Sequence, residues 1–502
     1  MNVWIITTGS SDVQLNRKDH WQNLLRNIRS QVDRGFTPTE GTDNRFLAPA
    51  RVMGTVYSQA QAEQYWGDLA FPLLDNFVGQ IQNKGIDQII LILTDQTAVF
   101  SPEQRRSQHS PYWQDTCALE PILTTYLKGK FPQAKLKPLL LQPKSPTEGL
   151  DDWNRVFELI QEEFSTWDFP DDSTIYVSHQ AGTPAISSSV QFEILLRFGQ
   201  RVKFLVSSER DSKLTKILEQ STYLRGIRKQ EAKALLERHD YSGVKELLSP
   251  YLNPEIQDLL DAVIQWNFAK FEDFAKAITA TAQKYSKDNE WWRMVDEEVK
   301  ERSTEWWWTA YESAYLGVVR LKQGNTVEAM FHSFRAVEGL LAKWVDKYNN
   351  SEKQGKRITK EGKKIKLSHR IIAPWDNTKT TDKVNAYGQG LYFALNFFEG
   401  VDKNKDTDMD IWTFGNFVFD KRNGLFHKLE GLQDKESVFE AWEISTGDEQ
   451  EWKNRVLGCL NFVSGQTFKF LDQEELDGTA ASLMVRVHEK LVKTLADYEH
   501  TP

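Results

Sequence analysis

The sequence predicts an α/β domain built on a parallel sheet, followed by an all-helical second half. Two observations predict this division. Before about residue 215, short apolar runs rich in β-branched residues alternate with amphipathic stretches, as strands and helices do when they alternate along a chain. After that residue, apolar positions recur with helical spacing and the short runs nearly vanish.

Five apolar runs in the first part have the length and composition of buried parallel strands. They lie at 2–9, 86–95, 135–142, 173–179 and 201–208. Amphipathic patterns typical of helices lie between them, at 60–84, 114–130, 151–165 and 184–198. Strands and helices in alternation imply an open, Rossmann-like parallel sheet with helices on both faces.

The second half has the pattern of one helix after another. Residues 223–252 suggest a helix pair, 258–285 continue in the same style, and helical patterns run from about 305 to the end. The polar break at 349–368 is the most basic stretch of the chain. A solvated loop is the favoured interpretation of this break, and an RNA-contacting loop is the alternative.

Length, charge and cysteine usage exclude several classes of protein. A chain of 502 residues has room for two or three domains. A formal charge of −9 and a pI near 5.7 argue against a protein that coats nucleic acid through bulk electrostatics, although a local basic site stays open. Cys117 and Cys459 lie far apart, which suggests neither a disulfide framework nor a cysteine zinc site. The early polar residues and the lack of about 18 consecutive apolar residues predict a soluble, cytoplasmic protein.

Two loops that follow predicted strands are rich in small hydroxyl residues, at the edge where open parallel sheets bind ligands. The first loop, TTGSSD (7–12), lacks the G-x-G-x-x-G fingerprint of a dinucleotide site. In the second, SHQAGTPAISSS (178–189), Gly182 frees the backbone, Thr183 suits a helix cap and Pro184 suits the first helical position. Both loops suit phosphate groups, and helix capping alone would also explain them. A third strand end, 93–100, adds the candidates Thr94 and Gln96.

The stretch KRNGLFHKLE (421–430) places an arginine and a histidine close together in the helical half. Asn-Gly favours a surface turn, and an Arg followed by a His after four to six intervening residues is expected about once by chance. Requiring an Asn directly after the Arg lowers that expectation below about 0.1. Arg422, Asn423 and His427 meet the full requirement and are the candidate catalytic residues.

The two loops, the helical second half and the Arg-Asn-x-x-x-His motif together resemble the CARF/HEPN ribonucleases that accompany type III CRISPR systems. The segment FHSFRAVEGLLAKW (331–344) also resembles the HEPN helix that carries an Arg and a Glu three residues apart, here Arg335 and Glu338. The resemblance covers essentially the whole chain. It implies a CARF ligand-sensing domain at 1–215, a helical connector at 216–300 and a HEPN ribonuclease domain at 301–502.

The resemblance implies that the CARF domain binds a cyclic oligoadenylate across the twofold axis of a homodimer. Cyclic tetra-adenylate is the preferred ring and cyclic hexa-adenylate is the competitor. No residue of the two loops distinguishes between these ring sizes. His179 departs from the small residue expected beside the glycine turn, so ligand contact and a purely structural role both stay open for it. By the family pattern, the ring would contact Thr8, Gly9, Ser10 and Ser11 in the first loop, and His179, Gly182, Thr183 and Pro184 in the second.

The catalytic chemistry follows from residue types. RNA carries its own nucleophile, the ribose 2′-hydroxyl, so a nuclease without metal ligands can cut it by intramolecular transfer. His427 suits general acid or base work, Arg422 presents a planar fork to phosphate oxygens, and Asn423 would orient either one or cap a helix. We see no His, Asp and Glu cluster with metal spacing in the second half, which predicts no metal and no cofactor. The expected products carry 2′,3′-cyclic phosphate and 5′-hydroxyl ends, and the resemblance implies a composite cleft with two copies of the motif.

Several residues have a competing structural interpretation. Arg335 and Glu338 are expected to support the helix of Arg422 through an ion pair rather than to act directly. The tryptophans at 291–292 and 306–308 are expected to pack rather than to stack on bases. Some relatives also cut their own activator in the CARF pocket, and the hydroxyls of the first loop make such a ring-nuclease activity conceivable here.

Two other functions are compatible with parts of the same sequence. The alternative is a ligand sensor whose helical half is a dimerisation or regulatory module without nuclease activity. An enzyme that uses the sheet for a nucleotide cofactor is disfavoured by the missing glycine fingerprint. The expected partners are the ring, single-stranded RNA and a second copy of the chain, with no membrane and no stable complex with the CRISPR effector. Ring binding is expected to reach the nuclease through the connector.

Overall fold

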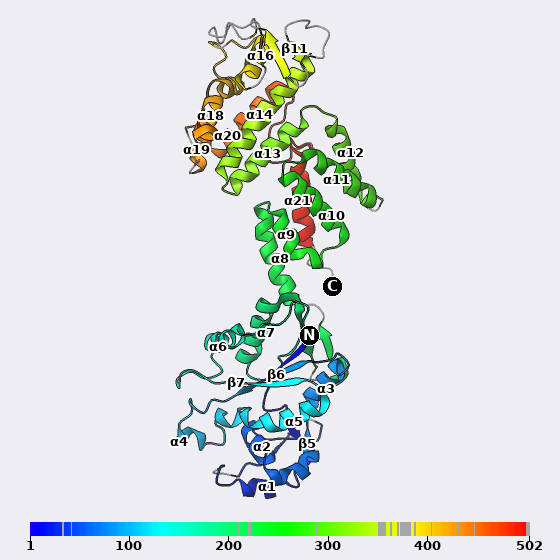
Figure 1. The fold of residues 1–502 in the computed structure, drawn as a ribbon, viewed down its shortest axis with the longest axis vertical. Helices are drawn as coiled ribbons and strands as arrows, with labels where there is room; N and C mark the ends of the chain where they lie inside the picture. The colour runs from blue at the N-terminus through cyan, green and yellow to red at the C-terminus, as the bar shows by residue number, and fades with distance from the viewer. Residues whose placement is uncertain are drawn as a thin grey trace. The chain divides into compact units, whose positions relative to one another are not determined.

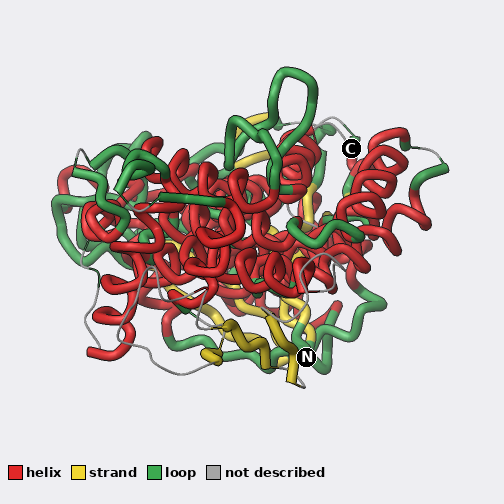
Figure 2. Tube along the Cα trace, turned by 90° about the horizontal axis from the view of Figure 1, so that it is seen from above, coloured by secondary structure: helices red, strands yellow, loops and turns green. Residues whose placement is uncertain are grey.

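The computed structural model describes residues 1–32, 35–41, 43–208, 211–218, 222–287, 289–349, 358–361, 364–368, 371, 383–385, 388–402, 404–428, 432, 434–445 and 447–497. The chain divides into two compact units, Met1–Gly226 and Ile227–Pro502, each with its own buried hydrophobic residues (Figure 1). Helices outweigh strands in the described chain (Figure 2). No helix among the described residues is long and apolar enough to cross a membrane.

The first unit is built on a six-stranded sheet with the order β10-β9-β8-β1-β6-β7. Its strands are β1 (Asn2–Thr7), β6 (Gln88–Thr94), β7 (Lys135–Leu141), β8 (Thr174–Ser178), β9 (Val202–Val206) and β10 (Lys216–Leu218). All neighbours pair in parallel except β10, which runs antiparallel to β9 at one edge. The five predicted parallel strands are therefore confirmed, and the antiparallel edge strand β10 is an addition to them.

Alternate side chains of the central strands enter two separate cores, one on each face of the sheet. Trp4 and Ile6 of β1 belong to one core, and Val3 and Ile5 belong to the other. Successive side chains of a strand point to opposite faces, so a strand that is apolar throughout is buried on both. The first core is covered by α1 (Trp21–Asn27), α2 (Ala50–Tyr57), α3 (Pro72–Ile81) and α5 (Glu120–Lys130), and the second by α6 (Trp153–Ser165) and α7 (Pro184–Phe198).

Two of the predicted helices are shorter than their sequence patterns indicate. Residues 60–84 divide into a 3-10 helix (Ala60–Asp68), strand β5 (Leu69–Ala70) and α3, and two 3-10 turns precede α5. Strand β5 belongs to a small antiparallel sheet with the order β3-β4-β2-β5. Its strands have two residues each, too few for any periodicity to show: β2 (Gln14–Leu15), β3 (Thr39–Glu40) and β4 (Phe46–Leu47).

The second unit is mainly helical, as the sequence predicts. Its helices up to residue 303 are α8 (Thr222–Glu237), which begins in the first unit, α9 (Tyr241–Leu248), α10 (Pro254–Asn267), α11 (Phe271–Tyr285) and α12 (Glu290–Ser303). The later helices are α13 (Trp308–Lys322), α14 (Thr326–Asn349), α16 (Gln389–Glu399), α17 (Asp410–Thr413), α18 (Phe419–Lys428), α19 (Lys435–Ala441), α20 (Glu449–Ser464) and α21 (Leu483–Asp497).

A small antiparallel sheet departs from the all-helical expectation. Its strands are β11 (Ile358–Glu361), β12 (Lys364–Ser368) and β13 (Lys383–Asn385), paired in that order. Two of them lie in the basic stretch 349–368, which the sequence favoured as a solvated loop. The remaining residues of that stretch include 350–357, which lie outside the described residues.

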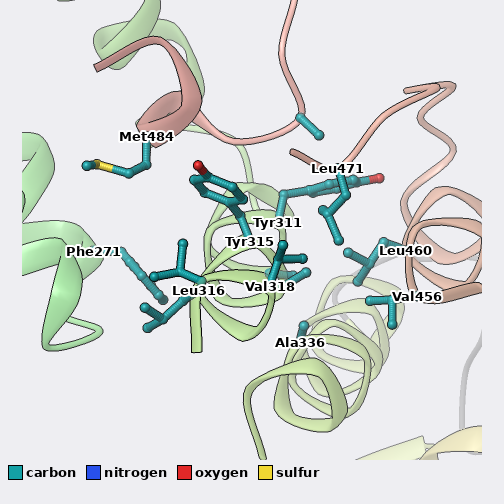
Figure 3. Packing of buried hydrophobic residues seen from close by; sticks show 14 of the residues in the cluster. Phe271, Tyr311, Tyr315, Leu316, Val318, Ala336, Val456, Leu460, Leu471 and Met484 are labelled. Carbon is teal, nitrogen blue, oxygen red and sulfur yellow. The ribbon is translucent and has the colours of Figure 1, made fainter. Parts of the chain in front are cut away.

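Helix α13 lies in the middle of the second unit's core. Figure 3 shows its apolar side chains among Phe271 of α11, Ala336 of α14, and Val456 and Leu460 of α20. Helices α13 and α14 approach closely at Gly317, where an added Cβ would lie 3.2 Å from the carbonyl oxygen of Ala329. The position of α14 against α13 is therefore fixed by packing at short range.

The C-terminal helix α21 packs beside the first helices of the unit (Figure 1). The Tyr241 hydroxyl forms a 3.0 Å hydrogen bond with Nδ1 of His488, and the His488 ring stacks on His239 at 4.0 Å between centroids. One apolar cluster of this unit includes residues from Ala232 to Leu495. The two-unit division has its boundary at Gly226, and the expected boundaries at 215 and 300 stay predictions.

Candidate functional site

Three loops leave the sheet of the first unit at the same edge. Strands β1, β6 and β8 are parallel neighbours, so the chain segments after Thr7, Thr94 and Ser178 start side by side. The first and second loops touch, because a Cβ added to Gly9 would lie 2.9 Å from the backbone nitrogen of Gly182. Gly182 has φ +94°, which residues with a side chain rarely adopt. The two predicted loops therefore form one continuous surface.

Two of the predicted ligand-binding hydroxyls point into the protein. Thr8 is 3% exposed, and its hydroxyl donates to the carbonyl oxygen of Ile92 at 2.7 Å and lies 2.7 Å from the Thr116 hydroxyl. Thr94 is 8% exposed, and its hydroxyl accepts a 3.0 Å hydrogen bond from the Thr116 N–H. Both side chains tie the loops to each other. The hydroxyl side chains of the first loop that reach the surface are the partly exposed Ser10 and the exposed Ser11.

Gln96 connects the loop after β6 to two other segments. Its backbone N–H and its Nε2 donate to the Asp115 carboxylate at 2.8 and 3.1 Å, and its Oε1 accepts from the Leu150 N–H at 2.8 Å. Arg51 of α2 donates from Nη2 to Asp95 and to Asp115 at 2.7 Å each. The side-chain amide of Gln96 is thus committed to holding the loop in place.

The second loop ends in the predicted helix cap. The Thr183 hydroxyl accepts from the Ile186 N–H at 3.2 Å and donates to the Leu150 carbonyl oxygen at 2.8 Å, and α7 begins at Pro184. The capping prediction is confirmed, and contact of these residues with a ligand stays a prediction. His179 is half-buried, with Nδ1 3.1 Å from the Ser187 hydroxyl, and burial lowers its pKa. A neutral, anchored imidazole follows for His179 at neutral pH.

Sequence reasoning missed the charged groups beneath this edge. Asp12 is 1% exposed, and its Oδ2 accepts the Gly9 N–H at 2.8 Å. Burial raises the pKa of Asp12 to about 7, which the Gly9 hydrogen bond opposes. Asp12 is the last residue of the first loop, and Asp95 directly follows strand β6. A carboxylate after each strand was therefore the feature of the sequence that could have indicated these groups. Arg51 carried none, since it lies 44 residues from Asp95 in the sequence.

The RNGLFH segment lies in helix α18 and not in a turn. A π-helix, Phe414–Val418, directly precedes α18. Such π-helical turns are rare and occur often at functional sites. The side chains of Asn423 and His427 lie outside the described residues, so Arg422 is the one member of the predicted catalytic set whose side chain is placed.

Arg422 lies against helix α14. Its guanidinium carbon is 4.9 Å from the centroid of the Phe334 ring, a geometry in which the cation is attracted by the ring. Glu338 lies one turn further along α14. Burial raises the pKa of Glu338, while the charge of Arg422 and a hydrogen bond from the Gly388 N–H oppose this rise. A ring on α14 and a nearby carboxylate therefore hold the arginine in place.

Arg335 does not form the expected ion pair with Glu338. No ion pair joins these two side chains in the described part of the chain, and the electrostatic partner of Glu338 is Arg422. The Arg335 guanidinium lies 5.9 Å from the Phe331 ring, and its side chain lines a pocket with Lys343. The hydrogen bond from Gly388 draws the Glu338 carboxylate toward α16 and away from Arg335.

The first turn of α16 fixes the π-helix that precedes Arg422. Gln389 donates from Nε2 to the Gly415 carbonyl oxygen at 3.1 Å, and Asn416 donates from Nδ2 to the Tyr392 hydroxyl at 3.1 Å. A Cβ added to Gly415 would lie 2.2 Å from the Tyr392 ring, so that ring requires a glycine there. The phase of α18, and with it the direction of Arg422, depends on this contact.

The tryptophan clusters pack, as expected. Trp292 and Trp308 are 1% and 4% exposed, and Trp292 donates from Nε1 to Glu255 at 2.6 Å. Lys490 lies over the Trp291 ring at 5.4 Å and Lys347 over the Trp306 ring at 4.9 Å. Among the described residues, no group of three or more His, Cys, Asp or Glu side chains is arranged to hold a metal ion.

Comparison with known proteins gives a likeness of fold. No protein-family model matches the sequence, and no match was found among curated proteins. Among solved structures, the chain is similar to Enterococcus italicus Csm6 bound to cyclic hexa-2′-fluoro-hexa-dAMP, with a TM-score of 0.55 and 12% identity. The likeness covers 99% of this chain and 100% of that one. The likeness therefore confirms the fold expected from the sequence, a parallel-sheet domain followed by a mainly helical half.

Proposed function

We propose that this protein is a metal-independent endoribonuclease that cuts single-stranded RNA when a cyclic oligoadenylate binds its first unit, in type III CRISPR defence. The observation that carries the proposal is Arg422, which α18 places beside Glu338 in an Arg-Asn-x-x-x-His motif of a Csm6-like fold. The name of the similar structure states that it is bound to a cyclic oligonucleotide of six modified dAMP units, which supports a cyclic oligonucleotide ligand here.

In the proposed reaction, the RNA attacks itself. His427 takes the proton of a ribose 2′-hydroxyl, whose oxygen forms a bond to the adjacent phosphorus. Arg422 donates hydrogen bonds to the phosphate oxygens, on which negative charge develops in the transition state. The bond to the 5′-oxygen breaks, and that oxygen takes up a proton from His427 of a second copy. The products carry 2′,3′-cyclic phosphate and 5′-hydroxyl ends.

In the proposed sensor, the ring lies against the surface formed by the first and second loops. Thr8, Thr94, Gln96 and Thr183 hold the loops in shape through their hydrogen bonds. Direct contacts then fall to the exposed Ser11, the partly exposed Ser10 and backbone groups near Gly182. Rings of four and six adenylates are both candidates, and a homodimer supplies the second half of the contact surface.

The test is cleavage of a fluorescent single-stranded RNA in EDTA, with no ring, with cyclic tetra-adenylate or with cyclic hexa-adenylate. Wild type should cut with one ring and leave 2′,3′-cyclic phosphate ends, and His427→Ala should be slower by about 10²–10⁴-fold. Silence of the wild type with both rings, despite tight ring binding, would instead support a sensor whose helical half only dimerises or regulates.

A further inference from the structure

A pocket of about 410 Å³ opens between helices α11, α13 and α14 of the second unit. Its floor consists of small side chains that leave room above the α13–α14 contact, namely Ala310, Ser313, Ala336 and Gly339. Three cationic side chains line it: Lys270, Arg335 and Lys343. Two carboxylates, Glu272 and Asp273, also line it, so cations are in excess.

Within the part of the chain that the structure describes, none of the three cations has a carboxylate partner at ion-pair distance. No ion pair of the described residues includes any of them, whereas Asp273 of the same pocket pairs with Lys276 at 3.6 Å. Lys343 donates from Nζ to the Thr309 hydroxyl at 2.7 Å. Partial burial lowers the pKa of Lys343, which the charge of Glu272 opposes. Lys343 has already lost part of its hydration on burial. An anion that enters the pocket would therefore stabilise the charged form of this lysine.

The pocket lies on the face of α14 next to the one that holds Arg422. Phe334 and Glu338 form one row on this helix, against Arg422. Arg335 and Lys343 lie on the adjacent row, turned by about 100° around the helix axis. Lys343 follows Arg335 by two turns of helix, which separates their Cα atoms by about 12 Å along the axis. At this spacing the two cations suit successive phosphates of one strand, so that each cation meets its own phosphate.

We propose that the pocket lined by Arg335, Lys343 and Lys270 binds successive phosphates of the single-stranded RNA substrate as the strand passes over α14 from the cleavage centre. The inference rests on the proposed ribonuclease function. A neighbouring pocket of about 660 Å³ shares Glu272, Thr309 and Lys343 with the first and extends the surface. In this proposal, Arg335 does not support the helix of Arg422. It holds the RNA upstream or downstream of the cleaved bond.

The test measures RNA binding by the full chain in a His427→Ala background, with the activating ring present. The variant Arg335→Gln/Lys343→Gln is compared with Lys284→Gln/Arg293→Gln, which removes the same charge from two exposed cations that pair with Asp258 and Glu290. For an RNA of about 20 nucleotides, we expect the Kd of the first variant to rise about tenfold and its salt slope to fall by about 1.4. The control should change less than about twofold.

Cleavage by the same two variants with His427 intact separates this inference from the proposed function. The pocket variant should raise KM for the long RNA and leave both kcat and the cutting of a trinucleotide unchanged. An unchanged Kd with normal cleavage would overturn the pocket and leave the ribonuclease standing. Loss of trinucleotide cleavage would place Arg335 in the cleavage centre and would also overturn the pocket's proposed role. Full competition by free AMP would overturn that role too, because it would assign the pocket to a mononucleotide. Absence of any RNA binding or cleavage by wild type would overturn both.

Discussion

The candidate site of the first unit is held by hydrogen bonds between loops, with a partly buried arginine and its carboxylate partners beneath them, whereas that of the second unit rests on one arginine packed against helix α14. In the first unit, the hydroxyls of Thr8 and Thr183 donate hydrogen bonds to backbone carbonyl oxygens of neighbouring segments. In the second, the Arg422 guanidinium lies against the Phe334 ring, and its charge acts on the Glu338 carboxylate. The first arrangement presents a preformed surface to a large ligand, and the second presents one reactive charge. Substitutions should therefore damage the two sites independently.

Arg422→Ala should break the second site alone and has the largest expected effect. It removes hydrogen bonds to the developing phosphate charge, and we expect RNA cleavage to slow by about 10²–10³-fold. Arg422→Lys keeps the charge without the planar fork and should recover only part of the rate. Ring binding, measured by calorimetry, should match wild type. A parallel loss of ring affinity would show that Arg422 also supports the ring-binding surface, and that its effect is not confined to the second site.

Asp12→Asn should sharpen the comparison by removing the buried carboxyl that accepts the Gly9 N–H beneath the first site. The pKa of Asp12 is raised to about 7 from an ordinary value of 3.8, so the folded state binds its proton more tightly than the unfolded state. The stability that this proton supplies is complete below pH 4 and is lost as pH rises through about 7. The loss is on the order of 4 kcal/mol.

Unfolding of the first unit in urea, followed at pH 5 and pH 8, measures this dependence. Wild type should lose stability toward pH 8, and Asp12→Asn should lose much less, because asparagine still accepts the Gly9 N–H and carries no charge. A variant with the same pH dependence as wild type would contradict the assignment to Asp12.

Gly182→Ala should weaken the first site alone, by a smaller amount. The left-handed backbone at φ +94° costs a residue with a side chain about 1–2 kcal/mol, so the free loop of the variant should relax to another conformation. Ring binding must then restore the original conformation, and ring affinity should fall about five- to thirty-fold. Gly199→Ala is the matched control, since Gly199 has φ +54°, open space around it and no place at the three loops. Equal ring affinities of the two variants would argue against ring contact near Gly182. The rate at saturating ring should stay near that of wild type.

Tyr392→Phe should have the smallest effect, at the second site. It removes the hydrogen bond from Asn416 but keeps the ring that packs on Gly415. We expect a loss of about 0.5–1.5 kcal/mol in stability and less than about tenfold in cleavage rate. Gly415→Ala, which drives a Cβ into that ring, should cost more in both measurements. If the two substitutions had equal effects, ring packing would not set the direction of α18.

The parts of the fold that the sequence predicts are those with strong local patterns. Strands β1, β6 and β8 are apolar throughout because both faces are buried, and Thr183 with Pro184 follows local capping rules. The 60–84 segment misleads because its helical pattern is interrupted by β5, whose partner β2 is more than 50 residues away. Pairing over such distances leaves no local trace.

The same distinction separates what could and could not be foreseen at the sites. The Arg-Asn-x-x-x-His spacing is visible in the sequence, but the partner of Arg422 on α14 depends on how three helices pack. The inward direction of Thr8 depends on the register between β1 and β6, which no local residue type encodes. Residue types indicated which side chains belong to the sites, and tertiary packing decided which of them remain available to a ligand.

The central claim is that a ring bound to the first unit controls chemistry in the second. The most direct measurement is the RNA cleavage rate of the wild-type protein as a function of ring concentration, beside a binding isotherm for the same ring. We predict a low rate without ring and a rise that saturates where binding saturates. Equal rates with and without a ring that demonstrably binds would contradict the claim.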